Sequence, residues 1–215
     1  MRCPELVRFT VATERGLAQF GQTPENLYIL SESNFAKLAG TVNSQGVLTI
    51  AAIPPPPSRE TPPQVPFIVA LDGVRDPGNF GTICRTLRSA GLTELWYTKG
   101  SIDPYGDKAI RSGLGIQFAL QLRFFDHLKA LHAAAAEFGF DKVFLTDPHK
   151  GENCFNTPDL FEHSVVVIGG EANGVNNLSG ARHVTIPMPG NYESLNAAQA
   201  ATIFLFEYVR RLTSV

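Results

Sequence analysis

Residues 185–212, TIPMPGNYESLNAAQAATIFLFEYVRRL, decide the fold at the carboxyl end of the chain. They continue a buried strand end, Val184–Ile186, into a loop. Pro187, Pro189 and Gly190 fix the backbone of this loop and prevent regular structure there. The remainder has the composition of a long helix. The stretch therefore predicts a strand, a loop and a helix, which form an edge over which other segments can close.

The helix is expected to begin within residues 193–196, because Ser194 and Asn196 are favourable N-cap residues. Apolar residues then recur every three or four positions, as they do on one face of a helix. This stripe consists of Leu195, Ala198, Thr202, Leu205, Val209 and Leu212, and it is widened by Ile203 and Phe206. The polar residues beside the free N–H groups of the helix start are Asn191, Glu193, Ser194 and Asn196. The stripe is typical of any core helix, whereas the loop predicts a functional site.

The composition excludes several classes of protein. The chain has 215 residues, 44% of them hydrophobic, which suits one ordinary domain with an appendage and argues against disorder. The net charge of −2 provides no overall basic field for nucleic acid, although basic residues exceed acidic ones between Asp72 and Arg123. No apolar run approaches the ~20 residues of a membrane span, and the N-terminus lacks the pattern of a signal peptide. Three scattered cysteines suit a reducing compartment, so we expect a cytoplasmic location and no metal site.

A proline-rich stretch divides the chain. Residues 54–64 contain two proline runs and predict an extended, semi-rigid linker. Residues 1–53 precede it and offer little material for an independent core. We expect a strand at 26–30, a helix at 32–38 capped by Ser31 or Ser33, and a strand at 46–53. Residues 65–215 form the main domain.

Strand and helix patterns alternate along this main domain. Strands are expected at residues 67–71, 95–97, 116–122, 142–145, 164–168 and 184–186. Helices are expected at 78–90, 107–112 and 126–137, the last capped by Asp126, and at the carboxyl end of the chain. The run at 67–71 is continuously apolar, as in a strand buried on both faces. The alternation predicts an α/β fold, with a mostly parallel sheet covered by helices on both faces.

The first stretch with chemical potential is residues 71–86, LDGVRDPGNFGTICRT. A buried strand ends, a Pro-Gly turn follows, and Asn79 opens a helix whose free N–H groups suit an anion. The carboxyl edge of such a sheet is where ligands bind. Arg85 lies in the second turn, so its side chain can reach back towards the helix start. The alternative is a tight turn with a surface arginine. The glycine spacing is not that of a dinucleotide-binding fingerprint.

The second stretch is residues 165–175, VVVIGGEANGV, which has the same organisation. Gly169 and Gly170 allow another backbone or a ligand to approach closely. Glu171 at a buried strand end is costly unless it is paired or hydrogen-bonded, and Arg85 and Asn79 are candidate partners. The alternative is a plain glycine turn with an exposed glutamate.

Together with the opening stretch, these segments resemble the motif set of the SpoU (TrmH-like) branch of the SPOUT RNA methyltransferases. Residues 76–86 resemble its first motif, 169–174 its second, and 186–188 with 193–196 its third. Residues 108–115, KAIRSGLG, are similar to a basic helix and Ser/Gly turn found between the first two motifs. The resemblance covers about residues 65–212.

This resemblance implies a parallel sheet whose C-terminal segment forms a deep trefoil knot, a feature otherwise nearly absent from proteins. It implies S-adenosylmethionine as the cofactor, bound in the knot. The residues implied for cofactor binding are Gly170, Ile186, Met188 and Leu195. It further implies a homodimer, with the terminal helix and the helix of the first motif near the interface.

The implied reaction is methyl transfer to a ribose 2′-hydroxyl of RNA, with rRNA favoured over tRNA as the substrate. Arg85 would bind the adjacent phosphate and orient or help deprotonate the hydroxyl, because a guanidinium with a pKa above ~12 is a poor base. Asn79 and Glu171 would hold Arg85 in place, and Ser194 and Asn196 would position the cofactor or the ribose. The basic residues expected to face RNA are Arg75, Lys108 and Arg111.

Two departures from the family pattern bear on substrate binding. Family members often carry a complete N-terminal domain that resembles an RNA-binding ribosomal protein, whereas residues 1–53, including 44–48, resemble only its second part. We expect the missing first part to reflect a truncation or a wrongly assigned initiator. The C-terminal half is also acidic. The alternatives to an enzyme are a non-catalytic RNA-binding protein with the same fold and a generic nucleotide-binding α/β protein.

Overall fold

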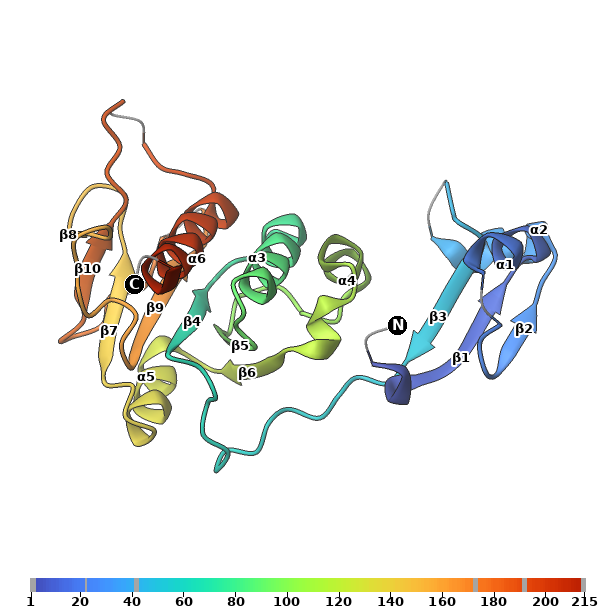
Figure 1. The fold of residues 1–215 in the computed structure, drawn as a ribbon, viewed down its shortest axis with the longest axis horizontal. Coiled ribbons are helices and arrows are strands. Elements are labelled where there is room, and N and C mark those ends of the chain that lie inside the picture. The colour runs from blue at the N-terminus through green and yellow to red at the C-terminus, as the bar shows by residue number, and fades with distance from the viewer. Residues whose placement is uncertain (1–2, 22, 41–42, 172–173, 191–192, 214–215) are drawn as a thin grey trace. The chain divides into compact units, whose positions relative to one another are not determined.

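The computed structural model describes residues 3–21, 23–40, 43–171, 174–190 and 193–213. The chain divides into two compact units at the junction of Pro55 and Pro56 (Figure 1). We call residues 3–55 the N-terminal unit and residues 56–213 the C-terminal unit. No described helix is both long and apolar enough to cross a membrane.

The N-terminal unit is built on a three-stranded sheet of order β2-β1-β3. Its elements are η1 (Pro4–Leu6), β1 (Val7–Ala12), α1 (Glu14–Phe20), β2 (Leu27–Ile29), α2 (Glu32–Ala39) and β3 (Val47–Ala51). Ser31 caps α2 by accepting a hydrogen bond from the backbone N–H of Asn34, as the sequence predicted. The central strand β1 and the helix α1 were not predicted. Strand β1 pairs in parallel with β2 and antiparallel with β3.

The C-terminal unit contains a seven-stranded sheet of order β6-β5-β4-β9-β7-β10-β8, in which every pairing is parallel. Its strands are β4 (Phe67–Asp72), β5 (Glu94–Thr98), β6 (Gln121–Phe125), β7 (Lys142–Thr146), β8 (Glu152–Asn153), β9 (Ser164–Gly169) and β10 (Arg182–Thr185). Its helices are α3 (Pro77–Ser89), α4 (Asp107–Gly113), η2 (Ile116–Ala119), α5 (Leu128–Glu137) and α6 (Ala197–Thr213). The predicted α/β class is confirmed, and the trefoil knot stays a prediction.

Helices cover both faces of this sheet, as expected (Figure 1). Alternate residues of β4 point to opposite faces. Phe67, Val69 and Leu71 pack in the core shared with α3, α4 and α6, whereas Ile68 and Ala70 pack in the core shared with α5. All of β4 is buried, which explains its continuous apolar run.

Two local predictions for this unit are wrong. Residues 116–122 were expected to form one strand, but a 3₁₀-helix occupies the first part and β6 begins at Gln121. The buried Gln117 amide donates hydrogen bonds to the carbonyl oxygens of Ala109 and Pro104, which holds this turn against α4. Asp126 does not cap α5. His127 is the N-cap, and its Nδ1 accepts a hydrogen bond from the backbone N–H of Ala130 at 3.0 Å.

The second half of the proline-rich stretch is bound to the C-terminal unit. Arg123 on β6 donates hydrogen bonds to the carbonyl oxygens of Ser58 at 2.9 Å and Thr61 at 2.7 Å. Its guanidinium also pairs with Glu94 at 2.5 Å, and Glu94 accepts a hydrogen bond from the Trp96 indole. These groups are buried, so their hydrogen bonds satisfy one another.

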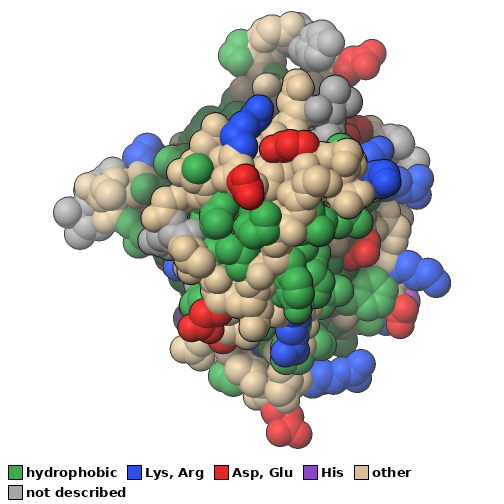
Figure 2. Space-filling model, turned by 90° about the vertical axis from the view of Figure 1, so that its right-hand side faces the viewer, with side chains coloured by type: hydrophobic (Ala, Val, Ile, Leu, Met, Phe, Trp, Pro, Cys, Tyr) green, Lys and Arg blue, Asp and Glu red, His purple; other side chains and the backbone are tan. Residues whose placement is uncertain are grey.

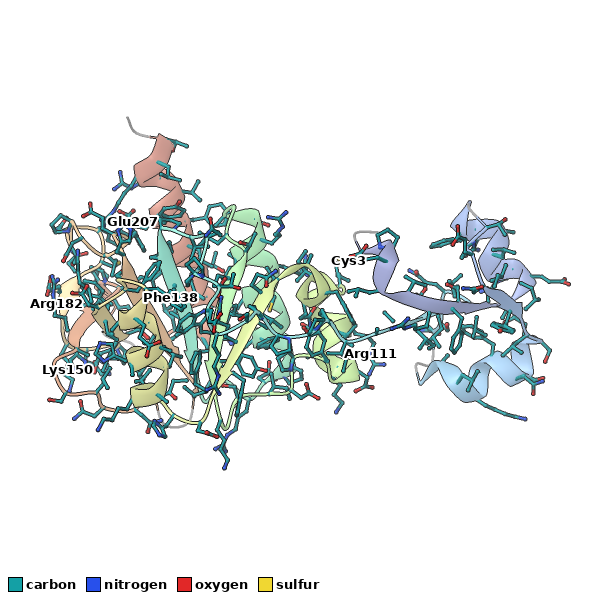
Figure 3. The ribbon with its side chains drawn as sticks, turned by 90° about the horizontal axis from the view of Figure 1, so that it is seen from below. Cys3, Arg111, Phe138, Lys150, Arg182 and Glu207 are labelled. Atoms are coloured by element: carbon teal, nitrogen blue, oxygen red, sulfur yellow. The ribbon has the colours of Figure 1, made fainter. Side chains whose placement is uncertain are left out.

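Helix α6 begins where the sequence placed its start. Asn196 is its cap, because Oδ1 accepts hydrogen bonds from the backbone N–H groups of Ala198 and Gln199. The buried Glu207, labelled in Figure 3, lies in the second half of this helix. It accepts hydrogen bonds from Arg210 and Arg211. The hydrogen bond from Arg210 is the largest cause that lowers the pKa of Glu207 to about 2. The exposed part of the predicted apolar stripe is at Phe206 and Leu212.

Candidate functional site

A cavity of about 250 Å³ opens where three parallel strands end. It lies at the carboxyl ends of β7, β9 and β10 and at the start of α6, the edge at which open α/β sheets bind ligands. Its lining residues are Thr146, Asp147, Pro148, Ile168, Gly169, Gly170, Glu171, Gly174, Val184, Ile186, Met188, Glu193, Ser194, Leu195, Ala197, Ala200 and Phe204. All four residues expected to bind the cofactor are among them, together with Glu171 and Ser194.

Gly169, the last residue of β9, and Gly170, which follows it, are needed for backbone packing. A Cβ atom on Gly170 would overlap the carbonyl oxygen of Gly73, and one on Gly169 would overlap the backbone of Gly174. The sequence predicted that another backbone or a ligand comes close to these glycines. In the structure, other backbone segments do so. Gly170 still lines the cavity, so its backbone forms part of the wall.

A chain of hydrogen bonds joins the three motif segments beside this cavity. The Asn79 side chain, at the start of α3, donates a hydrogen bond to the Glu171 carboxylate after β9. The Asn196 side chain donates to Asn79 Oδ1 at 2.9 Å. Asn79 is thus one of the two partners expected for Glu171. Glu171 itself is exposed, so the expectation of a buried glutamate is wrong. We call Glu171, Asn79 and Asn196 the polar relay.

A shallow groove lies on the other side of Asn79 and Asn196. Its walls come from the start of α3, the end of α4 and the first turns of α6, and they carry no charged side chain among the described residues. The lining residues are Gly78, Asn79, Thr82, Ser112, Leu195, Asn196, Ala198, Gln199, Thr202 and Ile203. Ser112 fixes α4 against α3 by donating a hydrogen bond to the Gly78 carbonyl oxygen at 3.1 Å. Leu195 lines both the cavity and the groove.

Arg85 stands apart from the polar relay. It lies on the exposed side of α3 and lines neither the cavity nor the groove. Within the described part of the chain its side chain has no hydrogen-bond or ion-pair partner. The structure therefore does not show the contacts with Asn79 and Glu171 that the sequence suggested.

The three residues expected to face RNA are all exposed. Arg75 follows β4 and donates a hydrogen bond from Nε to the Gly100 carbonyl oxygen. Lys108 and Arg111 lie on α4, where Arg111 forms an ion pair with Asp107 at 2.7 Å. Figure 3 shows Arg111 at the α4 side of the C-terminal unit and Arg182 at the opposite, β10 side. The predictions for Asn191, and for Ala172 and Asn173 of the second motif, concern residues outside the described part of the chain.

Sequence reasoning missed two acidic residues of this region. Asp147 lines the cavity directly after β7, and its Oδ1 accepts backbone hydrogen bonds from His149 and Lys150. Asp72 ends β4 and accepts hydrogen bonds from Thr98 and Asn176. Both follow a buried strand directly or end one, so the rule that ligands meet the carboxyl ends of parallel strands could have found them.

Comparison with known proteins identifies the family. The family model of the SpoU rRNA Methylase family matches residues 66–206. An uncharacterized tRNA/rRNA methyltransferase of Synechocystis is 30% identical over 86% of this chain and 67% of its own length. The 23S rRNA (guanosine(2553)-2′-O)-methyltransferase RlmP of Bacillus subtilis is 27% identical over 96% of this chain and 82% of its own.

A solved structure agrees with this result. The SpoU methyltransferase AviRb from Streptomyces viridochromogenes, in complex with the cofactor AdoMet, is 27% identical and superposes with a TM-score of 0.77. The alignment covers 97% of this chain and 84% of AviRb. The chain spans only 54% of the length of the mitochondrial rRNA methyltransferase 3 of mouse and of human. Since the family model matches well over half of the chain, this protein belongs to the SpoU rRNA methylase family.

Proposed function

We propose that this protein transfers a methyl group from S-adenosylmethionine to a ribose 2′-hydroxyl of RNA, with rRNA as a better candidate than tRNA. The observation that carries the proposal is the polar relay, which joins the three motif segments beside the cavity. The names of similar proteins support it, since RlmP acts on a 2′-O position of 23S rRNA and AviRb binds AdoMet.

The cavity fits the proposed cofactor in its chemistry. Ile186, Leu195 and Phe204 supply apolar surface for a flat ring. The charged groups of the described lining are three carboxylates, those of Asp147, Glu171 and Glu193, and no lysine or arginine accompanies them. An acidic, partly apolar wall suits a ligand that carries a positive sulfur. When bound, the cofactor supplies a methyl group on that positively charged sulfur.

The chain's own residues would align the ribose. In this proposal the polar relay holds the Glu171 loop and the start of α6 in place relative to α3. Ser194 and Glu171 then face the cavity together. A fixed geometry of this kind lowers the entropic cost of bringing two reactants together. The hydroxyl oxygen forms the new bond to carbon, its proton leaves to solvent or to a nearby base, and the sulfur keeps the electron pair of the broken bond.

Arg85 is assigned to the RNA backbone. Its exposed guanidinium has no hydrogen-bond or ion-pair partner within the described part of the chain, so it is available for a phosphate, which a guanidinium can grip with two hydrogen bonds. Arg75, Lys108 and Arg111 would add electrostatic attraction to other phosphates. In this scheme Arg85 orients the attacking ribose through the adjacent phosphate.

A homodimer through α6 is part of the same proposal. The uncharged groove between α3, α4 and α6 offers a surface that a second copy can cover, and Ile203 in the groove continues to the exposed Phe206 on α6. Exposed apolar side chains gathered along one helix mark interaction surfaces. Sedimentation at micromolar concentration should give twice the chain mass. A monomer that methylates RNA at the full rate would contradict this part.

The N-terminal unit is proposed to contribute to RNA binding without a strong charge effect. Residues 1–55 contain four basic residues and four acidic ones. Figure 2 draws the side chains of both units, with Lys and Arg interspersed with Asp and Glu on the face that it shows. A cytoplasmic location is likewise proposed, and cell fractionation would test it against the mitochondrial location that the names of several relatives carry.

The decisive experiment measures methylation of RNA by the purified protein with radiolabelled S-adenosylmethionine. We expect label in RNA at a position that resists alkaline cleavage, as a 2′-O-methyl group does. Calorimetry with the cofactor accompanies it. Binding of cofactor and RNA without transfer would favour the non-catalytic RNA-binding alternative. Failure to bind the cofactor would refute the proposal.

A further inference from the structure

The carboxylate of Asp72 lies at a junction of three segments that the mechanism above does not use. Asp72 ends β4 and is 3% exposed. Its Oδ1 accepts a hydrogen bond from the Thr98 hydroxyl, at the end of β5, at 2.6 Å. Its Oδ2 accepts two from Asn176, from the backbone N–H at 2.7 Å and from the side-chain amide at 2.9 Å. A buried carboxylate is thus fully hydrogen-bonded, as its burial requires.

These hydrogen bonds hold both ends of the segment that carries Glu171. The backbone carbonyl oxygen of Asp72 accepts a hydrogen bond from the Gly170 N–H at 3.0 Å, directly before Glu171. The side chain of Asp72 binds Asn176, which lies five residues after Glu171. Gly170 and Gly174 also pair in an isolated bridge. A single residue of β4 therefore holds the loop on either side of the glutamate.

The loop needs such support because its own composition supplies little. Glycine at positions 170 and 174 leaves many backbone conformations open to the free loop, and fixing them costs entropy. Glu171 is exposed, and the described structure gives its carboxylate one hydrogen bond, from Asn79. Asn79 belongs to α3, which begins five residues after Asp72. Asp72 thus holds the acceptor of this hydrogen bond in reach of a donor on the next helix.

We propose that Asp72 and Asn176 are positioning residues for methyl transfer, which act by holding the Glu171 loop against the polar relay. This inference rests on the proposed function. It assigns different roles to the two partners of one carboxylate. Asn176 connects Asp72 to the loop, whereas Thr98 connects it only to the neighbouring strand.

The two partners provide a matched pair of variants. Asn176→Ala removes one hydrogen bond at an exposed position, and Thr98→Val removes one at a buried position with nearly the same shape. We expect Asn176→Ala to lower kcat about tenfold, with the KM for RNA changed less than about threefold. Compared with Asn176→Ala, Thr98→Val should lower the melting temperature more and kcat less. Losses of kcat that follow the losses of stability would overturn the proposal, because that order indicates a purely structural role.

A swap tests the pair directly. Asn176→Asp places a second carboxylate against Asp72 and should lower kcat further. Adding Asp72→Asn removes one of the two like charges. With its nitrogen in the place of Oδ2, the new amide can donate to the carboxylate of residue 176, while its oxygen, in the place of Oδ1, still accepts from Thr98. Part of the activity should return, because only the backbone N–H of residue 176 loses its acceptor. Absence of rescue in a folded double variant would contradict the assignment.

Hydrogen exchange separates this inference from the proposed function. The backbone amide hydrogens of Gly170 and Gly174 should exchange faster in Asn176→Ala than in the wild type. In Thr98→Val they should exchange at the wild-type rate. If the wild-type protein binds no cofactor or methylates no RNA, the proposed function fails, while the exchange result still decides whether Asp72 holds the loop through Asn176. Equal exchange in all three proteins would overturn the inference, whatever the activity.

Discussion

The two units of this protein bury their apolar residues to very different extents. The N-terminal unit has a small core around Val11, Phe35 and Ala39. The C-terminal unit has an extensive core on each face of its sheet. Yet of the large hydrophobic residues that are exposed in the described part of the chain, six lie in the N-terminal unit and five in the C-terminal unit, which is nearly three times as long. Small units bury a lower fraction of their surface and are correspondingly marginal.

This difference separates stability from recognition. The parallel sheet holds its site rigidly. The strands that end at the cavity, β7, β9 and β10, each lie between two neighbouring strands of the sheet. The N-terminal unit keeps apolar side chains such as Tyr28, Ile29 and Leu38 at its surface. We therefore expect chemistry and most of the stability to depend on the larger unit alone. The four predictions that follow test this comparison.

The largest effect is expected for Arg85→Ala in the C-terminal unit. Methyl transfer should fall about 100-fold or more, because the attacking ribose loses the phosphate contact that orients it. Cofactor affinity should stay within about threefold, because Arg85 lies outside the cavity. Lysine should rescue poorly, since it lacks the planar fork that grips phosphate. Single-turnover methylation and separate binding of cofactor and RNA measure these quantities. Near-normal turnover would show that Arg85 has no part in the reaction.

Gly170→Val should lower the free energy of unfolding of the C-terminal unit by about 3 kcal/mol, because the new side chain must displace the Gly73 backbone. Loss of cofactor binding should accompany this destabilisation. Gly190→Ala is the control, since a Cβ there meets no atom of the described residues within 4 Å apart from its chain neighbours. Thermal unfolding of the two variants measures the difference. A fully stable Gly170→Val protein that fails to bind cofactor would mean that a ligand, and not Gly73, occupies this space.

Leu48→Ala should weaken the N-terminal unit by about 2 kcal/mol, the low end for such a truncation, because Leu48 is only half-buried against Phe35 and Val11. This is a large share of what so small a core supplies. Hydrogen exchange should accelerate in β1 and β3 and stay slow in β4 and β9. Faster exchange in β4 as well would show that the two units unfold together.

Glu207→Gln should have the smallest effect, about 1 kcal/mol, and only above acid pH. The pKa of Glu207 lies at about 2 in the folded protein, below its ordinary 4.5, so its ion pairs stabilise the fold above about pH 4.5 and are lost as the pH falls towards 2. The expected effect of about 1 kcal/mol is kept small because solvent screens the ion pair with Arg210, whose side chain is 59% exposed. Unfolding curves of the variant and the wild type should converge at low pH. A constant difference from pH 2 to 7 would contradict the assignment.

The sequence predicted the C-terminal unit better than the N-terminal unit for a physical reason. Strands such as β4 and β9 are buried on both faces, so their residues are continuously apolar and stand out. Strand β1, with the sequence VRFTVA, mixes polar and apolar residues and was overlooked. Strand β8 has two residues and gives no pattern at all. The cap of α5 was misplaced by one residue, because Asp126 and His127 can both accept a hydrogen bond from a helix start.

The sequence by itself determined the family, the α/β class and the three motif segments that meet at the carboxyl edge, because local motifs and strand periodicity depend on neighbouring residues. Only the tertiary structure decided which of these residues touch. Asn79 binds Glu171 across 92 positions and Asn196 across 117, and Asp72 binds Asn176 across 104. The order of the strands in the sheet, which places β9 beside β4, brings these distant segments together. Hydrogen bonds of this kind depend on side-chain direction in the folded sheet, which no local pattern in the chain contains.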